Sequence, residues 1–227
     1  DTLNEMNKNK LSLIANNSGN GIEFHHFNPD IFGSLADSMN RFTIGTMFRI
    51  MLPDIMPDLK KIIYLDSDLF VNTDIEELWN LNIDDYCLAA AQDCSTIRSW
   101  GTPYAVAAGQ TSCDRYFNAG VLCMNLENIR KNGSLFQQVM DYLSDNPRTW
   151  LPDQDALNAI FSGKTLLIDE KWNYFVIEAR KHNEKVEKKI YHYAATLLIL
   201  HTNNEIDRAY YFTILRTPWG EQMEDGL

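Results

Sequence analysis

The chain has 227 residues, 45% of them hydrophobic and 22% charged, which excludes a wholly disordered protein and is enough for one substantial core. Its net charge of −11 argues against nucleic acid, or a strongly anionic membrane surface, as the main partner. The four cysteines lack Cys-X-X-Cys spacing and are too few for a disulfide scaffold, so we expect free thiols in a reducing compartment. The longest apolar stretch, residues 194–200, is too short to cross a bilayer.

Predicted helices and strands alternate along most of the chain. Apolar residues at helical spacing predict a helix over 3–15, and alternating residues predict a strand over 22–27. Further helices are expected over 44–52, 74–79, 134–143, 153–161 and 205–215, and further strands over 60–65, 87–91, 117–126, 165–168 and 189–193. This order favours an α/β class protein, with three α/β/α layers around a mostly parallel central sheet.

Two carboxylates follow the β-prone apolar run at residues 60–65. Asp66 and Asp68 are one residue apart, and alternate residues of an extended chain point the same way, so both can present oxygens to one divalent cation. Because burying an unpaired carboxylate is costly, their place after an apolar strand indicates a ligand site at the strand end. Asp-X-Asp also occurs in phosphatases of the haloacid dehalogenase type, where the first Asp is a nucleophile. That phosphatase motif has Thr or Val two residues after the second Asp, where this chain has Phe70, and the difference counts against a phosphatase.

Several other polar residues stand where a ligand could bind, although each also has an ordinary structural explanation. Asn118 lies in an otherwise apolar strand and needs polar partners. Asp153 opens a helix after Pro152, where it can serve simply as an N-cap. His192 ends a strand, where a hydrogen-bonded histidine packed for structural reasons is common. Arg49 is either a surface arginine or, given the apolar helix around it, a buried one.

Four motifs, taken in order, resemble those of glycosyltransferase family 8. This family comprises retaining, nucleotide-sugar-dependent transferases of GT-A (Rossmann-like) fold, among them galactosyl- and glucosyltransferases of bacterial lipopolysaccharide. The likeness runs from the first predicted helix to Pro218-Trp219, so it covers nearly the whole chain. The motifs are Tyr64-Leu65-Asp66-Ser67-Asp68, Tyr116-Phe117-Asn118-Ala119-Gly120-Val121-Leu122, Leu151-Pro152-Asp153-Gln154-Asp155-Ala156-Leu157-Asn158 and Tyr191-His192-Tyr193.

The resemblance implies a metal site and a catalytic position. Asp66 and Asp68 would hold a divalent ion, Mn²⁺ or Mg²⁺, with His192 as the third protein ligand, and the ion would offset charge on the leaving UDP. Gln154 would lie by the anomeric carbon, on the face opposite the leaving group. Because Gln is a poor nucleophile, we expect Gln154 to stabilise charge in a front-side displacement without forming a bond.

The resemblance also implies residues that bind the donor. The position of Asp153 binds sugar hydroxyls in the family, and that of Asn118 hydrogen-bonds the donor sugar. Arg49 matches an arginine that contacts the donor, and Asp93 matches an acidic residue that binds sugar. These residues, together with Gln154, are therefore our candidates for recognising a UDP-sugar, and Asp153 joins Gln154 as a candidate catalytic residue.

Two departures from the family's pattern stand out. Members normally begin with a strand and loop that bind uridine, and nothing before Asp1 supplies them, so we expect a single GT-A domain over residues 1–227 that is incomplete or a fragment. After His192, relatives carry a Gly and a Lys that contact the diphosphate, whereas equal spacing gives Ala195 and Leu198 here. Losing the lysine would weaken donor binding by about 1.5 to 3 kcal/mol unless His201 or Arg208 compensates.

These observations predict a cytoplasmic, metal-dependent hexosyltransferase that moves glucose or galactose from a UDP-sugar to a glycan or glycolipid acceptor. Peripheral membrane association and oligomeric state stay open. A degenerate transferase retained as a binding protein is the main alternative, motivated by the lost Gly and Lys, and an Asp-X-Asp phosphatase is the third. Residues 95–115, rich in Gly, Ser and Thr, are either a lid or acceptor loop or an ordinary solvent loop.

Overall fold

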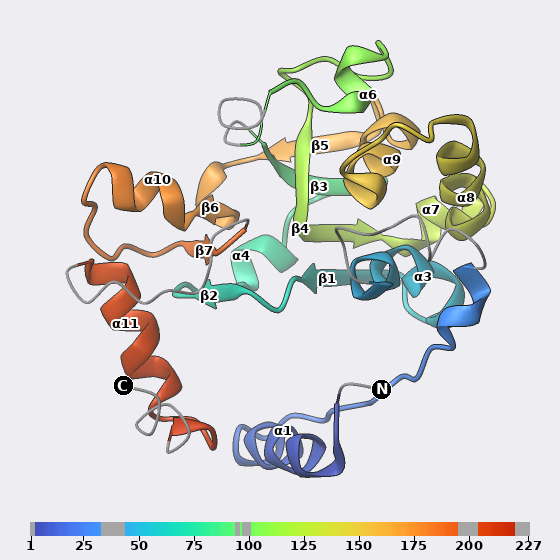
Figure 1. Cartoon of the computed structure of the whole chain (residues 1–227). Helices are drawn as coiled ribbons and strands as arrows, with labels where there is room; N and C mark the ends of the chain where they lie inside the picture. Colours follow the sequence, from blue (N-terminus) through green and yellow to red (C-terminus); the bar gives the residue numbers. More distant parts are fainter. Residues whose placement is uncertain (1–2, 33–43, 94–95, 97–100, 195–203, 221–227) are drawn as a thin grey trace.

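A four-stranded sheet forms the centre of the molecule, with helices gathered around it (Figure 1). The computed structural model describes residues 3–32, 44–93, 96, 101–194 and 204–220. The strand order is β1-β4-β3-β5, and a second, three-stranded sheet has the order β2-β7-β6. The strands are β1 (Lys61–Leu65), β2 (Leu69–Val71), β3 (Leu88–Gln92), β4 (Phe117–Asn125), β5 (Thr165–Ile168), β6 (Tyr174–Phe175) and β7 (Ile190–His192).

Helices precede, separate and follow these strands. The α-helices are α1 (Glu5–Asn17), α3 (Phe48–Ile55), α4 (Glu76–Trp79), α6 (Tyr104–Ala107), α7 (Leu126–Lys131), α8 (Leu135–Asp145), α9 (Pro152–Ile160), α10 (Val176–Lys181) and α11 (Glu205–Ile214). Short 3₁₀ helices are η1 (Pro29–Phe32), η2 (Ile44–Met47) and η3 (Glu170–Trp172).

The direction of β4 makes the central sheet a mixed one. β4 runs antiparallel to β1 and to β3, whereas β3 and β5 are parallel. The predicted α/β class with a mostly parallel sheet is confirmed, because β1, β3 and β5 run in the same direction and only β4 is reversed. The hydrophobic pattern could not reveal this, since a strand buried on both faces reads the same in either direction.

β4 is also the longest strand among those described, and it is buried along nearly its whole length. Every residue of β4 except Asn125 is buried. Leu122 and Met124 pack into the core beside α3, α7, α8 and α9, while Val121 and Cys123 pack into a second core on the opposite face. Because burying one such side chain contributes about 1.5 to 3 kcal/mol, this two-sided packing holds the strand rigidly. The polar residues at its start therefore have a fixed support.

The predicted strand over residues 22–27 is wrong. This segment has no regular secondary structure, and its Ile22 and Phe24 are 39% and 41% exposed. Alternation stabilises a strand only when a neighbouring strand pairs with it. Other expected helices and strands are confirmed with small shifts of their ends, whereas α6, α7, α10, β2 and β6 were not predicted. Residues 95–115 lie partly outside the described residues.

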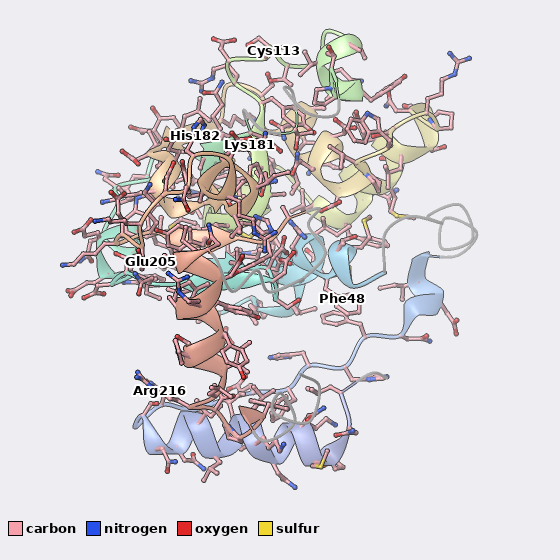
Figure 2. The ribbon with its side chains drawn as sticks, turned by 60° about the vertical axis from the view of Figure 1, so that its left-hand side comes forward. Phe48, Cys113, Lys181, His182, Glu205 and Arg216 are labelled. Atoms are coloured by element: carbon pink, nitrogen blue, oxygen red, sulfur yellow. The ribbon has the colours of Figure 1, made fainter. Side chains whose placement is uncertain are left out.

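α1 lies apart from both sheets and has no buried residue among its thirteen (Figure 1). The indole Nε1 of Trp219 donates to Asn7 Oδ1 (3.0 Å), and the Lys10 ammonium lies 5.4 Å from the Trp219 ring centre. Figure 2 shows α11 running from Glu205, beside the body of the protein, down to Arg216 next to α1. Within the described residues, we find no helix with the length and apolar character needed to cross a membrane.

Candidate metal and donor site

Asp66, Asp68 and His192 meet where the two sheets adjoin. Asp66 follows β1, Asp68 precedes β2, and His192 ends β7, which pairs antiparallel with β2. The register places His192 opposite Leu69, and the Tyr193 N–H donates to the Asp68 carbonyl oxygen (3.0 Å). The His192 Nε2 consequently lies 3.3 Å from Asp68 Oδ1 and 3.8 Å from Asp66 Oδ2. One potential ligand atom from each residue lies within 4.8 Å of the others.

Gly120 of β4 leaves the space that these side chains occupy. Its carbonyl oxygen accepts a hydrogen bond from the Asp66 N–H (2.8 Å). A Cβ at this position would collide with the His192 ring and lie 2.9 Å from Asp66 Oδ2. The glycine is therefore required by close approach of side chains, a known reason for glycine within a strand.

Arg49 is buried in α3 and joins Asp66 to Asp153. Its Nη2 lies 2.8 Å from Asp66 Oδ1, its Nε lies 3.3 Å from Asp153 Oδ2, and its Nη1 donates to the Ala119 carbonyl oxygen. Burial alone would lower the pKa of Arg49, but the two carboxylates outweigh it and raise that pKa. The guanidinium therefore stays charged and links the candidate metal ligands to the start of α9.

The two adjacent carboxyl groups have pKa shifts of opposite sign. Burial raises the pKa of Asp66, and this is only partly opposed by Arg49 and by the Tyr64 hydroxyl, which donates to Asp66 Oδ1 (2.6 Å). Burial also acts on Asp68, but the hydrogen bond and charge of His192 outweigh it, so the pKa of Asp68 lies below its usual range. A bound divalent ion would favour the ionised form of both groups.

The three side chains fit a divalent metal ion in both chemistry and orientation. Carboxylate oxygens together with an imidazole nitrogen suit Mn²⁺, and carboxylates alone suit Mg²⁺. His192 Nδ1 lies 2.8 Å from Asn173 Oδ1, so that nitrogen is already engaged and Nε2 faces the carboxylates. A metal-binding histidine usually donates its other ring N–H to an acceptor of this kind. The predicted trio therefore comes together as a candidate metal site.

A buried network of amides and one carboxylate adjoins this trio. Asn118 Nδ2 donates to Gln154 Oε1 (3.0 Å) and to Asp93 Oδ2 (3.2 Å). Gln154 Nε2 donates in turn to Asp93 Oδ2 (2.9 Å) and to the Tyr116 hydroxyl oxygen (3.2 Å). Asp93 is fully buried and also accepts hydrogen bonds from Thr96. The structure thus brings together three of the predicted donor-binding residues.

The side-chain oxygens of Gln154 and Asn118 are occupied within this network. Gln154 Oε1 accepts hydrogen bonds from Asn118 and from the Ala119 N–H (3.0 Å). Asn118 Oδ1 accepts from the Gly120 N–H and from Asn173 Nδ2, both at 2.8 Å. A sugar hydroxyl that binds these amides must therefore exchange with an existing partner.

Asp153 does not serve as the N-cap of α9. The N-cap residue is Leu151, Pro152 occupies the first turn, and Asp153 lies inside that turn with its carboxylate beside Arg49. Asp153 is only 6% exposed. An acidic side chain here is favoured by the helix dipole as well as by the guanidinium. The simple capping explanation is therefore insufficient.

The sequence reasoning missed several residues that complete the site. Asn173 and Tyr116 carried no recognisable pattern of their own, although Tyr116 begins one of the four motifs. Gly120 did carry a signal, because a glycine inside an apolar strand often marks a close approach. Ala195, Leu198 and His201 lie outside the described residues, and Arg208 is exposed on α11.

Solved structures with this fold are glycosyltransferases of GT-A type. The galactosyltransferase LgtC, in complex with donor and acceptor sugar analogues, matches with a TM-score of 0.78 and 24% identity, covering 93% of this chain and 80% of that one. The apo bifunctional glycosyltransferase WbbM matches with a TM-score of 0.76 and 18% identity, covering 98% of this chain and 44% of that one. The predicted GT-A fold is thereby confirmed.

The model of glycosyl transferase family 8 matches residues 1–201, and the chain belongs to that family. It is 28% identical over 193 residues to general stress protein A of Bacillus subtilis (strain 168), covering 82% of this chain and 65% of that protein. It is 26% identical over 182 residues to lipopolysaccharide 1,3-galactosyltransferase of Salmonella typhimurium (strain LT2), covering 76% of this chain and 52% of that protein. The chain thus spans between about half and two thirds of these relatives, and the predicted family is confirmed.

Proposed function

We propose that this chain carries the donor site of a metal-dependent, retaining glycosyltransferase that moves a hexose, glucose or galactose, from a UDP-sugar to a glycan or glycolipid acceptor. The observation that carries the proposal is the link between two groups of residues, which Asn173 joins through hydrogen bonds to His192 and to Asn118. The Asp66, Asp68 and His192 trio suits a metal-bound diphosphate, and the Asp93, Asn118 and Gln154 network beside it offers the polar groups that a sugar needs. Family membership supports the reaction class.

The metal site accounts for departure of the nucleotide. Mn²⁺ or Mg²⁺, when bound, would act as a Lewis acid that stabilises negative charge on the leaving UDP. Asp66, Asp68 and His192 would hold the ion, while Arg49 keeps Asp66 oriented through its 2.8 Å ion pair. The same arginine contacts Asp153, which fixes a carboxylate at the side where sugar hydroxyls would bind.

Gln154 suits charge stabilisation better than nucleophilic attack. An amide oxygen is a poor nucleophile, and this oxygen already accepts two hydrogen bonds at 3.0 Å. We propose that its carbonyl dipole stabilises positive charge at the anomeric carbon, while Asp93, Asn118 and Asp153 hold the donor sugar. The acceptor would then attack from the face that UDP leaves, which retains the configuration.

We also propose a cytoplasmic location, with peripheral contact to a membrane if the acceptor is a glycolipid. Cys87 and Cys123 are buried free thiols and Cys113 is an exposed one, as a reducing compartment permits. The acidic net charge of −11 gives no support for a nucleic-acid partner.

Titration of UDP by calorimetry, with and without MnCl₂, tests the function. The wild-type chain should bind UDP markedly more tightly with Mn²⁺. Asp68→Asn should lose most of that gain, because its affinity for the metal ion should fall by more than about 100-fold. Even substitutions of residues that only support the metal ligands lower metal affinity by about 10- to 100-fold. Asp68 is the sharper choice, since Asp66 also partners Arg49 and its loss would disturb folding.

The exposed Asp85 provides a matched control, and Asp85→Asn should behave like the wild type. NMR of the product formed from a UDP-hexose should show the anomeric configuration of the donor. Metal-independent UDP binding in the wild type, or equal binding by Asp68→Asn, would rule the proposed metal site out.

A further inference from the structure

We propose that Asn173 is a positioning residue that fixes His192 as a metal ligand and links the metal centre to the sugar-side network. The proposal rests on the metal site described under the proposed function. Asn173 belongs to none of the four sequence motifs and lies between η3 and β6.

Asn173 contacts both groups of residues directly. Its Oδ1 lies 2.8 Å from His192 Nδ1, and its Nδ2 donates to Asn118 Oδ1 at 2.8 Å. Asn173 is 5% exposed, and His192 is 3% exposed. A buried polar atom without a hydrogen-bond partner costs free energy, so both contacts of Asn173 are strongly favoured.

The orientation of these amides follows from a backbone group that cannot reverse. The Gly120 N–H can only donate, so it requires the oxygen of Asn118, not the nitrogen, at 2.8 Å. The Asn118 NH₂ group is then directed to the carboxylate of Asp93, which accepts it. The hydrogen bonds of the Asn118 oxygen and of its NH₂ group therefore require the same orientation of the amide.

That orientation determines the tautomer of His192. Because Asn118 Oδ1 also faces Asn173, Asn173 must present its NH₂ group there and its oxygen to the imidazole. An amide oxygen accepts only, so His192 Nδ1 carries a proton, and Nε2 is the nitrogen that faces Asp66 and Asp68 and is left for the metal ion. A main-chain amide of β4 thus selects the nitrogen that binds metal.

The pairing of β6 with β7 places Asn173 beside His192. β6 pairs in parallel with β7, with Phe175 opposite His192 and Tyr174 opposite Tyr191. The Phe175 ring also lies against the imidazole, with ring centres 5.5 Å apart. Asn173 is therefore held beside His192 by the strand that follows it, rather than by the metal ligands themselves.

Two substitutions of Asn173 separate its two contacts. Asn173→Leu keeps a similar volume but removes the acceptor for Nδ1–H and the donor to Asn118. Asn173→Asp keeps an acceptor for Nδ1–H but loses the donor to Asn118 Oδ1. Asn125→Leu is the matched control, because Asn125 lies at the far end of β4 and bonds Ile83 and Asn128 instead.

The first readout needs no metal and no turnover. In ¹⁵N NMR of the metal-free wild type, His192, assigned from the spectrum of His192→Gln, should show a protonated Nδ1. Asn173→Leu should lose this fixed pattern, whereas Asn173→Asp and Asn125→Leu should keep it. An Nδ1 without a proton in the wild type would overturn the proposal, even if Asn173→Leu fails to fold.

The second readout is Mn²⁺ affinity, followed by the electron paramagnetic resonance signal of the free ion. Asn173→Leu should bind Mn²⁺ about 10- to 100-fold more weakly, whereas Asn125→Leu and Asn173→Asp should stay within about threefold of the wild type. Wild-type affinity in Asn173→Leu would overturn the proposal. Failure of the wild type to bind Mn²⁺ would instead contradict the proposed function, and the metal-free tautomer would still test Asn173.

Discussion

At the scale of single residues, the size of the metal site depends on the absence of one side chain. Gly120→Ala should weaken Mn²⁺ binding by at least about tenfold and destabilise the fold by about 1 to 3 kcal/mol, as overpacking does elsewhere. The reason is that the added methyl group would meet the His192 ring and Asp66 Oδ2. Metal titration and urea unfolding measure the two effects.

Gly21→Ala is the control for this substitution, because nothing lies within 4 Å of a Cβ built at Gly21. It should change neither quantity. Unaltered Mn²⁺ affinity in Gly120→Ala would mean that the ligands do not sit against this glycine in the metal-bound protein.

A second residue-scale prediction concerns Asp155, which holds the Tyr116 hydroxyl. Its Oδ1 accepts hydrogen bonds from Tyr116 (3.0 Å) and the Ala105 N–H (3.2 Å), and its Oδ2 accepts from Thr149. Burial raises the pKa of Asp155 despite these bonds. The folded protein therefore binds this proton more tightly than the unfolded chain does, and ionisation costs stability above the raised pKa.

Asp155→Asn keeps the size of the side chain and removes the titration, although it exchanges one acceptor oxygen for a donor. The stability of the wild type relative to Asp155→Asn should rise as the pH falls from 7 toward the ordinary Asp value of about 3.9, by about 1.4 kcal/mol per unit of raised pKa. Urea unfolding of both proteins at several pH values measures the difference. A difference that does not change with pH would contradict the raised pKa.

The sequence revealed the charged residues of the site better than their supports. Asp66 and Asp68 could be predicted because carboxylates after an apolar strand demand a partner. The other candidates needed the family resemblance. Arg49, Asn118, Asp153 and His192 each had an ordinary structural explanation as well, and Asp93 and Gln154 were identified from the resemblance alone. Asn173 could not be predicted at all, since its role depends on the pairing of β6 with β7.

At the scale of elements, α11 is attached through a buried ion pair. Arg180 of α10 makes two hydrogen bonds to Asp207 of α11, at 3.0 and 2.9 Å, and the Tyr193 hydroxyl donates to the same carboxylate at 3.0 Å. Arg180→Met should lower the free energy of unfolding by about 3 kcal/mol, because it leaves a buried carboxylate without its cation. Urea denaturation provides the measurement.

The neighbouring Lys181 is the natural control, because it forms an ion pair with Glu178 at 2.9 Å but is half exposed. Lys181→Met should change the stability by less than about 0.5 kcal/mol. Equal losses in the two variants would show that burial of the Arg180 pair does not matter to α11.

Elements with their own periodic pattern could be predicted, and those defined by neighbours could not. α8 and α9 follow helical spacing, and β5 matches its expected ends. The direction of β4 and the missing strand at residues 22–27 depended on which strands pair, which a single segment does not encode. The same is true of the two-residue strand β6.

At the scale of the whole molecule, the candidate metal site connects the two sheets. Asp66 follows a strand of the central sheet, whereas Asp68 and His192 adjoin strands of the smaller one. Binding to the folded state alone stabilises it by about 2.7 kcal/mol at a Mn²⁺ concentration 100 times the Kd. For a chain of this length the Tm should rise by about 5 to 10 °C.

Scanning calorimetry of the wild type and of Asp68→Asn, each with and without Mn²⁺, tests this linkage. The shift should vanish in Asp68→Asn. An equal shift in both proteins would place the stabilising ion elsewhere on the acidic surface.

The pairing of β2 with β7 also sets the order in which the site can be made during synthesis. Asn173 and His192 leave the ribosome last among the site residues, after Asp66, Asp68, Asp93, Asn118 and Gln154. The sugar-side network can therefore assemble on the nascent chain while the metal ligands are still incomplete. Because domains fold as their sequence emerges, a chain that stalls before β7 would expose β2 as an unpaired edge and present two carboxylates without their histidine.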